Sequence, residues 1–514
     1  MHHRWWQLIS IGMLLASAAP LLQSQDYSEQ YRPQVHFSPR HNWTNDPNGL
    51  VYFEGEYHLF FQYNPFGDQW GHMSWGHAVS RDLLHWHELP VAIAENQDGM
   101  IFTGSVVVDR NNSGGFCAAG KACLVAIYTV HAQTANGIRQ TQNIAYSRDR
   151  GRTWTRYAKN PVLDLQLTDF RDPSVSWNDE ARRWIMAVSL PKEHKIRFYS
   201  STDLKAWTLL SDFGPAGDVA GDWECPDLLR IPSGSGSGKP PIWALKVGLN
   251  PGAPQGGSGE QYFLGSFNGT RFTASSEPGA HGWTNYGKDD YCAISFNGLS
   301  EKEEPVLLGW MSNWEYASKL PTSPWRGQMS LPRRLSFVQD GAGLALRQEP
   351  VTAGLRSTMH ELPERALTGK SDAQHDPSIA APYEAQLKFS NSEAEPFGVR
   401  LYSDETHWTE IGFDTKKSVF YIDRTKSEGI TASGFAVRTE APLALGRPYD
   451  LRLIVDRSSV EAYAQSGTIA MTDLIFPLSA KSTLEIFPAS AAKNNAVGHL
   501  WELKPIWDAS RAGK

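Results

Sequence analysis

The sequence predicts an all-β protein with two domains. Short runs of aromatic and β-branched residues follow one another from about residue 31 to about residue 346, and a second block of this kind begins near residue 381. Residues 50–53 and 57–62, for example, flank a Glu-Gly-Glu turn as the two arms of a hairpin would. No long segment has the periodicity of a helix, and 514 residues suffice for two cores.

A weak internal repeat indicates that the first block is modular. A Ser-x-Asp sequence followed by tryptophan occurs at residues 80–86, 147–154 and 201–207, each time after a strand-like run. Serine and aspartate side chains favour turns because they bond to nearby backbone groups, and the tryptophan can begin the next packed strand. The spacing suits one copy per blade of a β-propeller.

The composition changes along the chain predict the domain limits. We expect a signal peptide over residues 1–25, a propeller over 26–350, a linker over 351–380 and a β-sandwich over 381–514. The first segment has an early arginine, an apolar run and then small residues, which is typical of a secretory signal. A transmembrane anchor is the alternative, but the run is short for a membrane span. Residues 447–463 alternate as strands of a sandwich do.

Charge and cysteine content limit the function classes. The formal net charge of −7 has interspersed signs and argues against a nucleic-acid binder. The 19 tryptophans serve either large β cores or the apolar faces of sugar rings. Cys117 and Cys123 enclose a short Gly/Ala loop suited to a disulfide, whereas we expect Cys225 to be a small buried packing residue. The four cysteines lack the spacing of a zinc site.

Three acidic motifs carry the functional prediction: residues 43–49 (Trp-Thr-Asn-Asp-Pro-Asn-Gly), 170–173 (Phe-Arg-Asp-Pro) and 223–227 (Trp-Glu-Cys-Pro-Asp). Taken singly, each is compatible with an ordinary turn, because Asp-Pro and Asn-Gly are turn formers. Together they supply the carboxylates that glycoside hydrolysis needs, one as nucleophile or base and one as acid.

In this order, the three motifs resemble the signature boxes of glycoside hydrolase family 32, the β-fructosidases. Further boxes extend the resemblance over nearly all of the chain; they lie at residues 61–65, 75–80, 102–105, 309–314, 324–327 and 455–461. The resemblance implies a five-bladed β-propeller with an axial active site, followed by a C-terminal β-sandwich. The related five-bladed family that acts on arabinans and xylans fits the first and third motifs less well.

The resemblance also implies roles for individual residues. Asp46 corresponds to the nucleophile, Glu224 to the acid/base and Asp172 to the transition-state stabiliser that holds fructose hydroxyls. The expected substrate-binding residues are Asn45, Gln62, Trp70, Ser105, Arg171, Trp310 and Asn285. A retaining mechanism requires its two carboxyl groups about 5–5.5 Å apart. We expect no metal and no organic cofactor, since strand alternation scatters the histidines at 72, 77, 85 and 87.

One departure from the family pattern concerns the substrate. Asn285 stands where the family usually has an aspartate that is associated, in the plant branch, with sucrose preference. Residues 99–102 and 322–326 resemble bacterial levanases and exo-inulinases. We therefore expect a secreted exo-β-fructosidase that acts on levan, inulin and sucrose. An invertase, an endo-acting levanase or inulinase, a transfructosylase and an inactive carbohydrate-binding homologue are the alternatives.

Overall fold

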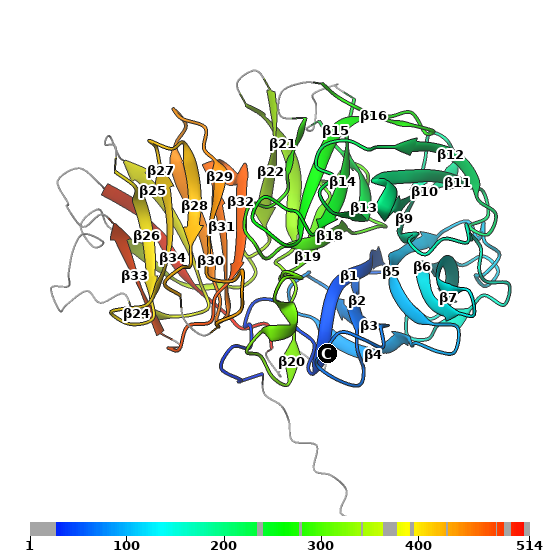
Figure 1. Ribbon diagram of the computed structural model, residues 1–514, viewed down its shortest axis with the longest axis horizontal. Helices are drawn as coiled ribbons and strands as arrows, with labels where there is room; N and C mark the ends of the chain where they lie inside the picture. The colour runs from blue at the N-terminus through cyan, green and yellow to red at the C-terminus, as the bar shows by residue number, and fades with distance from the viewer. Residues whose placement is uncertain are drawn as a thin grey trace, which may run out of the picture.

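A computed structural model describes residues 27–233, 240–276, 280–340, 343–362, 378–390, 395–427, 430–479, 481–487 and 495–507. The expected signal peptide therefore lies outside the described residues. Seven sheets form two bodies that lie side by side, a propeller in blue to green and a sandwich in yellow to red (Figure 1). The all-β fold class, with a five-bladed propeller before a sandwich, is confirmed.

Five sheets of four or five strands form the blades of the propeller. The first blade contains β1 (Asn42–Phe53), β2 (Glu56–Tyr63), β3 (Ser74–Ser80), β4 (His87–Ile93) and β20 (Trp325–Arg326). The second contains β5 (Met100–Asp109), β6 (Cys123–Thr134), β7 (Gly137–Ser147) and β8 (Thr155–Arg156). The third contains β9 (Arg171–Asn178), β10 (Arg183–Leu190), β11 (Lys195–Ser201) and β12 (Thr208–Phe213).

The remaining two blades follow in chain order. The fourth contains β13 (Asp222–Ile231), β14 (Ile242–Asn250), β15 (Gly259–Phe267), β16 (Phe272–Ala274) and β17 (His281–Trp283). The fifth contains β18 (Tyr291–Ser295), β19 (Val306–Trp310), β21 (Arg333–Asp340) and β22 (Gly343–Pro350). The late strand β20 pairs in parallel with β1, so a segment from the end of the propeller joins its first blade.

The three sequence repeats form the same turn in three successive blades. Each connects the third strand of its blade to the fourth, and the serine hydroxyl donates to the aspartate two residues later. The O–O distances are 3.0 Å in the first copy, 2.8 Å in the second and 3.1 Å in the third. The prediction that these copies mark blades is therefore confirmed.

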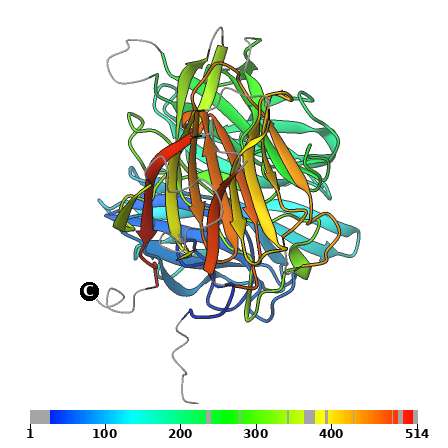
Figure 2. The same ribbon diagram turned by 90° about the vertical axis from the view of Figure 1, so that its left-hand side faces the viewer.

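Two six-stranded sheets form the C-terminal sandwich. One contains β23 (Arg356–Leu362), β34 (Asn495–Leu503), β25 (Tyr383–Ser390), β30 (Tyr449–Val455), β31 (Ser459–Ala464) and β32 (Ile469–Leu474). The other contains β24 (Ser378–Ala380), β33 (Lys481–Phe487), β26 (Phe397–Tyr402), β27 (Trp408–Asp414), β28 (Val419–Asp423) and β29 (Arg438–Pro442). Their inner faces share one apolar core. In Figure 2 the strands of the sandwich lie at the front and run roughly vertically.

The sandwich begins earlier than its sequence pattern indicates. Strand β23 lies within the stretch that the sequence assigns to a linker, yet it pairs with β34 at the edge of the sheet. Its residues 357–361 are exposed, which suits an edge strand and explains why no buried alternation marks it. Residues 363–377 lie outside the described part of the chain.

Helices are short wherever the chain is described. They are three 3-10 turns: η1 (Pro191–Glu193), η2 (Ala317–Lys319) and η3 (Gln465–Gly467). The described segments thus contain no helix of the length and hydropathy that crossing a membrane requires.

Candidate active site

The innermost strand of every blade carries a bulge of one extra residue. The bulges lie between Thr44 and Pro47, Ile101 and Gly104, Arg171 and Ser174, Glu224 and Asp227, and Tyr291 and Ile294. In each case the inner strand advances by three residues while its paired neighbour advances by two. A bulge bends a strand and redirects its side chains, so five equivalent bulges bring the three acidic motifs together around the propeller axis.

Asp46 lies in the bulge of β1. Thr103, from the bulge of β5, donates to Asp46 Oδ2 at 3.1 Å, while the buried Oδ1 has no partner among the described residues. Burial raises the pKa of Asp46 to about 7, and the negative charges of Asp172 and Glu224 add to the rise. The Asp46 carboxylate is therefore poorly solvated and lies in the field of the other two acids.

Asp172 lies in the equivalent bulge of β9. Its φ of 64° is in the left-handed region, where a residue without a glycine's freedom is strained. Its Oδ2 accepts a hydrogen bond of 3.0 Å from the backbone nitrogen of Cys225. Burial raises the pKa of Asp172, Arg171 opposes that rise, and Glu224 adds to it.

Glu224 is held from two sides. Arg171 Nε donates to Glu224 Oε1 at 3.0 Å, and the Tyr291 hydroxyl donates to Oε2 at 2.6 Å. Burial raises the pKa of Tyr291 well above its usual value and Glu224 raises it further, so the phenol keeps its proton and remains a donor. Arg171, Glu224 and Tyr291 occupy the same position before the bulge in three successive blades.

Arg171 is the cation of the site. Its Nη1 donates to Asp169 Oδ1 at 2.9 Å, which fixes the guanidinium from the side away from Glu224. Burial disfavours its charge, but Glu224 and Asp172 raise the pKa of the guanidinium, so it stays protonated. One buried arginine thus faces three carboxylates, and such a cluster retains protons that isolated acids would lose.

Two of the expected binding residues, Asn45 and Gln62, are buried. Asn45 Oδ1 accepts a hydrogen bond of 2.7 Å from Trp43 Nε1. In the orientation that satisfies its neighbours, the Asn48 amide accepts from Gln62 Nε2 at 3.1 Å and donates to Thr103 Oγ1 at 3.3 Å. This chain of amides connects Gln62 to the hydroxyl that bonds Asp46.

The tryptophans differ in exposure. Trp70 is 46% exposed and meets Phe102, in the bulge of β5, edge-on at 6.2 Å. It is therefore available to a ligand at the rim. Trp310 is fully buried, packs on Trp43 and Trp314, and belongs to the apolar cluster behind the carboxylates. The structure thus places Trp310 behind the site, where it supports Trp43, and not on its surface.

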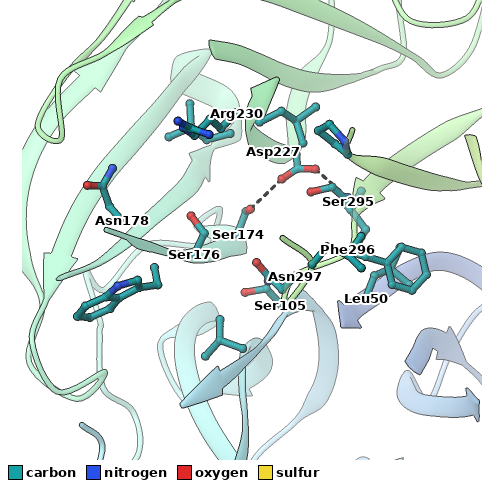
Figure 3. A pocket seen from close by; sticks show the side chains of 18 of the residues that line it. Leu50, Ser105, Ser174, Ser176, Asn178, Asp227, Arg230, Ser295, Phe296 and Asn297 are labelled. Atoms are coloured by element: carbon teal, nitrogen blue, oxygen red, sulfur yellow. Dashed lines mark hydrogen bonds between the residues drawn. The ribbon is translucent and has the colours of Figure 1, made fainter. Parts of the chain in front are cut away.

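Ser105 faces a second space on the propeller axis. Its Oγ accepts from the backbone of Val175 at 2.9 Å, and the residue lines a cavity of about 450 Å³ that also contacts Thr103, Asp172 and Cys225 (Figure 3). Across this cavity Asp227 accepts hydrogen bonds from Ser174 and Ser295, and Asn297 donates to the carbonyls of Val106 and Val175. Ser105 therefore helps to join the blades, and Thr103, two residues earlier, is the residue of this motif that contacts Asp46.

The structure does not support the expected role of Asn285 in substrate binding. Asn285 is 3% exposed, and its Nδ2 donates to Thr472 Oγ1 at 2.9 Å. Its Oδ1 accepts from the backbone nitrogens of Gly287 and Thr472. Because these contacts use the amide at the boundary with the sandwich, Asn285 connects the two domains. The sequence could not show this, since Thr472 lies far along the chain.

Cys225 is buried, as expected, but it is not only a packing residue. Cys225 and Cys292 form a disulfide, with their Cα atoms 5.4 Å apart. The disulfide expected between Cys117 and Cys123 is confirmed, with Cα atoms 5.2 Å apart. Among the described residues, Asp46, Cys225 and Cys292 have metal-ligand spacing, but disulfide sulfurs are not the thiolates that bind metals.

Sequence reasoning missed three residues that contact the predicted machinery: Thr103, Asp169 and Tyr291. Thr103 belongs to the Phe-Thr-Gly-Ser motif at residues 102–105. The bulge that turns its side chain toward Asp46 has no sequence signal. Tyr291 follows Asn285 closely in the sequence and belongs to a different blade from Glu224. Asp169 directly precedes the second acidic motif, so its contact with Arg171 was the easiest of the three to predict from the sequence.

Three carboxylates that converge with one buried arginine, in a propeller, define a site of the glycoside hydrolase class. A family model described as "Glycosyl hydrolases family 32 N-terminal domain" matches residues 36–350, and the model of that family's C-terminal part matches residues 351–502. The chain belongs to glycosyl hydrolase family 32 and is an enzyme of that family.

Individual relatives agree with this assignment. The levanase of Bacillus subtilis (strain 168) is 40% identical over 511 residues, which cover 97% of this chain and 74% of that protein. The extracellular exo-inulinase inuE of Aspergillus niger is 41% identical over 503 residues, which cover 91% of this chain and 93% of that protein. The crystal structure of exo-inulinase from Aspergillus awamori superposes with a TM-score of 0.86 at 37% identity, over 94% of this chain and 100% of that one.

Proposed function

We propose that this protein is a secreted, retaining exo-β-fructosidase that releases terminal β-D-fructofuranosyl residues from levan, inulin and sucrose. The observation that carries the proposal is the arrangement of Asp46, Asp172 and Glu224 in or beside equivalent bulges around one axis. The similarity to a levanase and to an extracellular exo-inulinase supports the substrate class and the secretion.

In the first half of the proposed reaction, the Asp46 carboxylate attacks the anomeric carbon of fructose. Glu224 gives its proton to the departing oxygen, and a covalent fructosyl-enzyme forms. The positive charge that develops on the ring is stabilised by the nearby carboxylates, while Asp172 accepts hydrogen bonds from fructose hydroxyls. The Tyr291 hydroxyl and Arg171 keep the Glu224 carboxyl aimed at the leaving group.

In the second half, water replaces the leaving group. Glu224, now a carboxylate, takes a proton from that water, which attacks the anomeric carbon and frees Asp46. Arg171 stabilises the Glu224 anion between the two steps, because its guanidinium contacts Oε1. Two inversions at one carbon retain its configuration. Glu224 thus makes both proton transfers of the proposed reaction.

The preference for fructans rests on the relatives and on the rim of the site. Arg326, from the levanase-like segment 322–326, pairs with Asp68 at 3.1 Å and thereby holds the loop that presents Trp70. Phe66, in the same loop, is 76% exposed. Exposed flat apolar side chains such as Trp70 and Phe66 suit a substrate with several sugar rings.

The experiment that tests this proposal is product analysis on levan, inulin and sucrose with the same enzyme preparation. Fructose as the sole early product from both fructans, with β-fructose as the first anomer seen by NMR, is the expected result. Early oligosaccharides would show endo action, and first-formed α-fructose would show inversion. A kcat/KM for sucrose more than about tenfold above that for the fructans, or about 1.4 kcal/mol, would make the chain an invertase.

A further inference from the structure

A covalent bond joins the two blades that carry Glu224 and Tyr291. Cys225 directly follows Glu224 in the bulge of β13, and Cys292 directly follows Tyr291 in the bulge of β18. The two cysteines form a disulfide, and the two residues before them form the 2.6 Å hydrogen bond from tyrosine to glutamate. The disulfide therefore connects equivalent positions of two bulges, one residue away from the contact that holds the expected acid.

The backbone at both cysteines needs support. Cys225 has a φ of 46° and Cys292 a φ of 47°, both in the left-handed region that residues with a side chain rarely adopt. Such conformations persist only where the surroundings hold them. The cysteines are also almost fully buried, at 2% and 0% exposure. A change at either one is thus transmitted directly to the neighbouring Glu224 or Tyr291.

The same cross-link touches the other two carboxylates. The backbone nitrogen of Cys225 donates to Asp172 Oδ2 at 3.0 Å, and its sulfur lies 4.0 Å from Asp46 Oδ2. Cys225 therefore contacts Asp46 and Asp172 and directly follows Glu224.

The two blades have other connections. The backbone of Ser295 donates to Asp227 Oδ2 at 2.8 Å, and that of Ala293 donates to Glu260 Oε1 at 2.8 Å. Glu260 is in turn paired with buried Lys246. These bonds should keep β18 against the fourth blade when the disulfide is removed. Loss of the disulfide should therefore change mainly the geometry of the two bulges.

We propose that the Cys225–Cys292 disulfide is a positioning group for the acid/base: it holds Glu224 and Tyr291 in register across the fourth and fifth blades. The inference rests on the proposed role of Glu224. A misplacement of about 1 Å in a reacting group can reduce a rate about a hundredfold. The disulfide therefore contributes to proton transfer in addition to its contribution to stability.

The test compares two disulfides of the same chain. The double variant Cys225→Ser, Cys292→Ser removes the bridge at the site. The matched control, Cys117→Ser with Cys123→Ser, removes the bridge at the opposite end of β5 from its bulge. Both lose a cross-link and are expected to have a lower Tm. For each protein, kcat/KM is measured on sucrose and on an activated aryl β-fructofuranoside, which needs little protonation of its leaving group.

We expect the site variant to lose about tenfold or more in kcat/KM on sucrose, and about threefold or less on the aryl fructoside. The control should keep the wild-type ratio of the two values within about twofold. A folded site variant with the wild-type ratio would overturn the proposal. If Glu224→Ala itself shows no dependence on the leaving group, the acid assignment is wrong and not the role of the disulfide alone.

A second measurement covers a site variant that does not fold. The Cys117→Ser, Cys123→Ser protein is reduced in its native state by a water-soluble phosphine, and its free thiols are counted by mass spectrometry after alkylation. Two new thiols accompanied by the same selective loss on sucrose support the proposal. Two new thiols with an unchanged ratio of kcat/KM values contradict it.

Discussion

Thr103 Oγ1 donates a hydrogen bond of 3.1 Å to Asp46 Oδ2, and this hydroxyl opposes the charge repulsion around the expected nucleophile. Burial, Asp172 and Glu224 raise the pKa of Asp46 to about 7, while the hydrogen bond lowers it. A residue of the neighbouring blade thus favours the ionised form of Asp46.

Replacing Thr103 by valine should move the acid limb of kcat/KM to higher pH. Asp46 must be ionised to act as a nucleophile, so kcat/KM falls as the pH drops through its pKa of about 7. Without the donor, that pKa rises, and we expect the limb to shift by about 1 pH unit. Thr103→Ser retains the hydroxyl and should keep the wild-type profile. A limb that does not move in Thr103→Val would contradict the link.

Asp46→Asn should lose several orders of magnitude in kcat and yet gain stability at neutral pH. An amide cannot form the covalent intermediate, which explains the loss of activity. Folding raises the pKa of Asp46 from 3.8 to about 7, so the folded state binds more protons than the unfolded state between those values. Ionised Asp46 therefore destabilises the fold increasingly from about pH 4 to pH 7.

The measurement is the Tm of the wild type and of Asp46→Asn at pH 8 and pH 4. The variant should melt a few degrees higher at pH 8, and the difference should shrink at pH 4. Near-normal turnover in the variant would remove Asp46 from the nucleophile role. An equal Tm difference at both pH values would show that the charge of Asp46 is not the cause.

Glu224→Ala should affect substrates according to their leaving groups. Sucrose and fructans need a protonated leaving oxygen, whereas an activated aryl fructoside does not, so kcat/KM should fall far more on the natural substrates. Azide, which needs no general base, should restore turnover of the aryl fructoside and yield a fructosyl azide. Equal losses on both kinds of substrate, without rescue by azide, would argue against the acid/base role. Tyr291→Phe should show a weaker form of the same selectivity.

The fold was largely predictable from local sequence patterns. The Ser-x-Asp…Trp repeats mark one turn per blade in three blades, because their hydrogen bonds lie within a few residues. The acidic motifs were likewise visible, since each contains its own carboxylate and proline. The edge strand β23 was missed because its exposed residues carry no buried alternation.

Contacts between blades could not be predicted from the sequence. The Cys225–Cys292 bond, the Tyr291–Glu224 hydrogen bond and the Thr103–Asp46 hydrogen bond each join different blades. They depend on the bulges, and an extra residue in a strand has no clear mark in composition. The same limit applies to Asn285, whose partner Thr472 belongs to the other domain.

The buried contacts of Asn285 lead to a prediction about stability and specificity. Its amide makes three hydrogen bonds with Thr472 and Gly287 at the boundary between the domains. Asn285→Ala should leave the buried backbone nitrogens of both partners without an acceptor, at a cost of about 1–3 kcal/mol in unfolding free energy. Asn285→Asp retains an acceptor for these nitrogens and should cost less. Neither variant should change the ratio of kcat/KM on inulin to that on sucrose by more than about twofold, which corresponds to about 0.4 kcal/mol. Denaturant unfolding gives the stability, and steady-state kinetics on the two substrates give the ratio. A tenfold move toward sucrose in Asn285→Asp, without a change in stability, would return Asn285 to the substrate site.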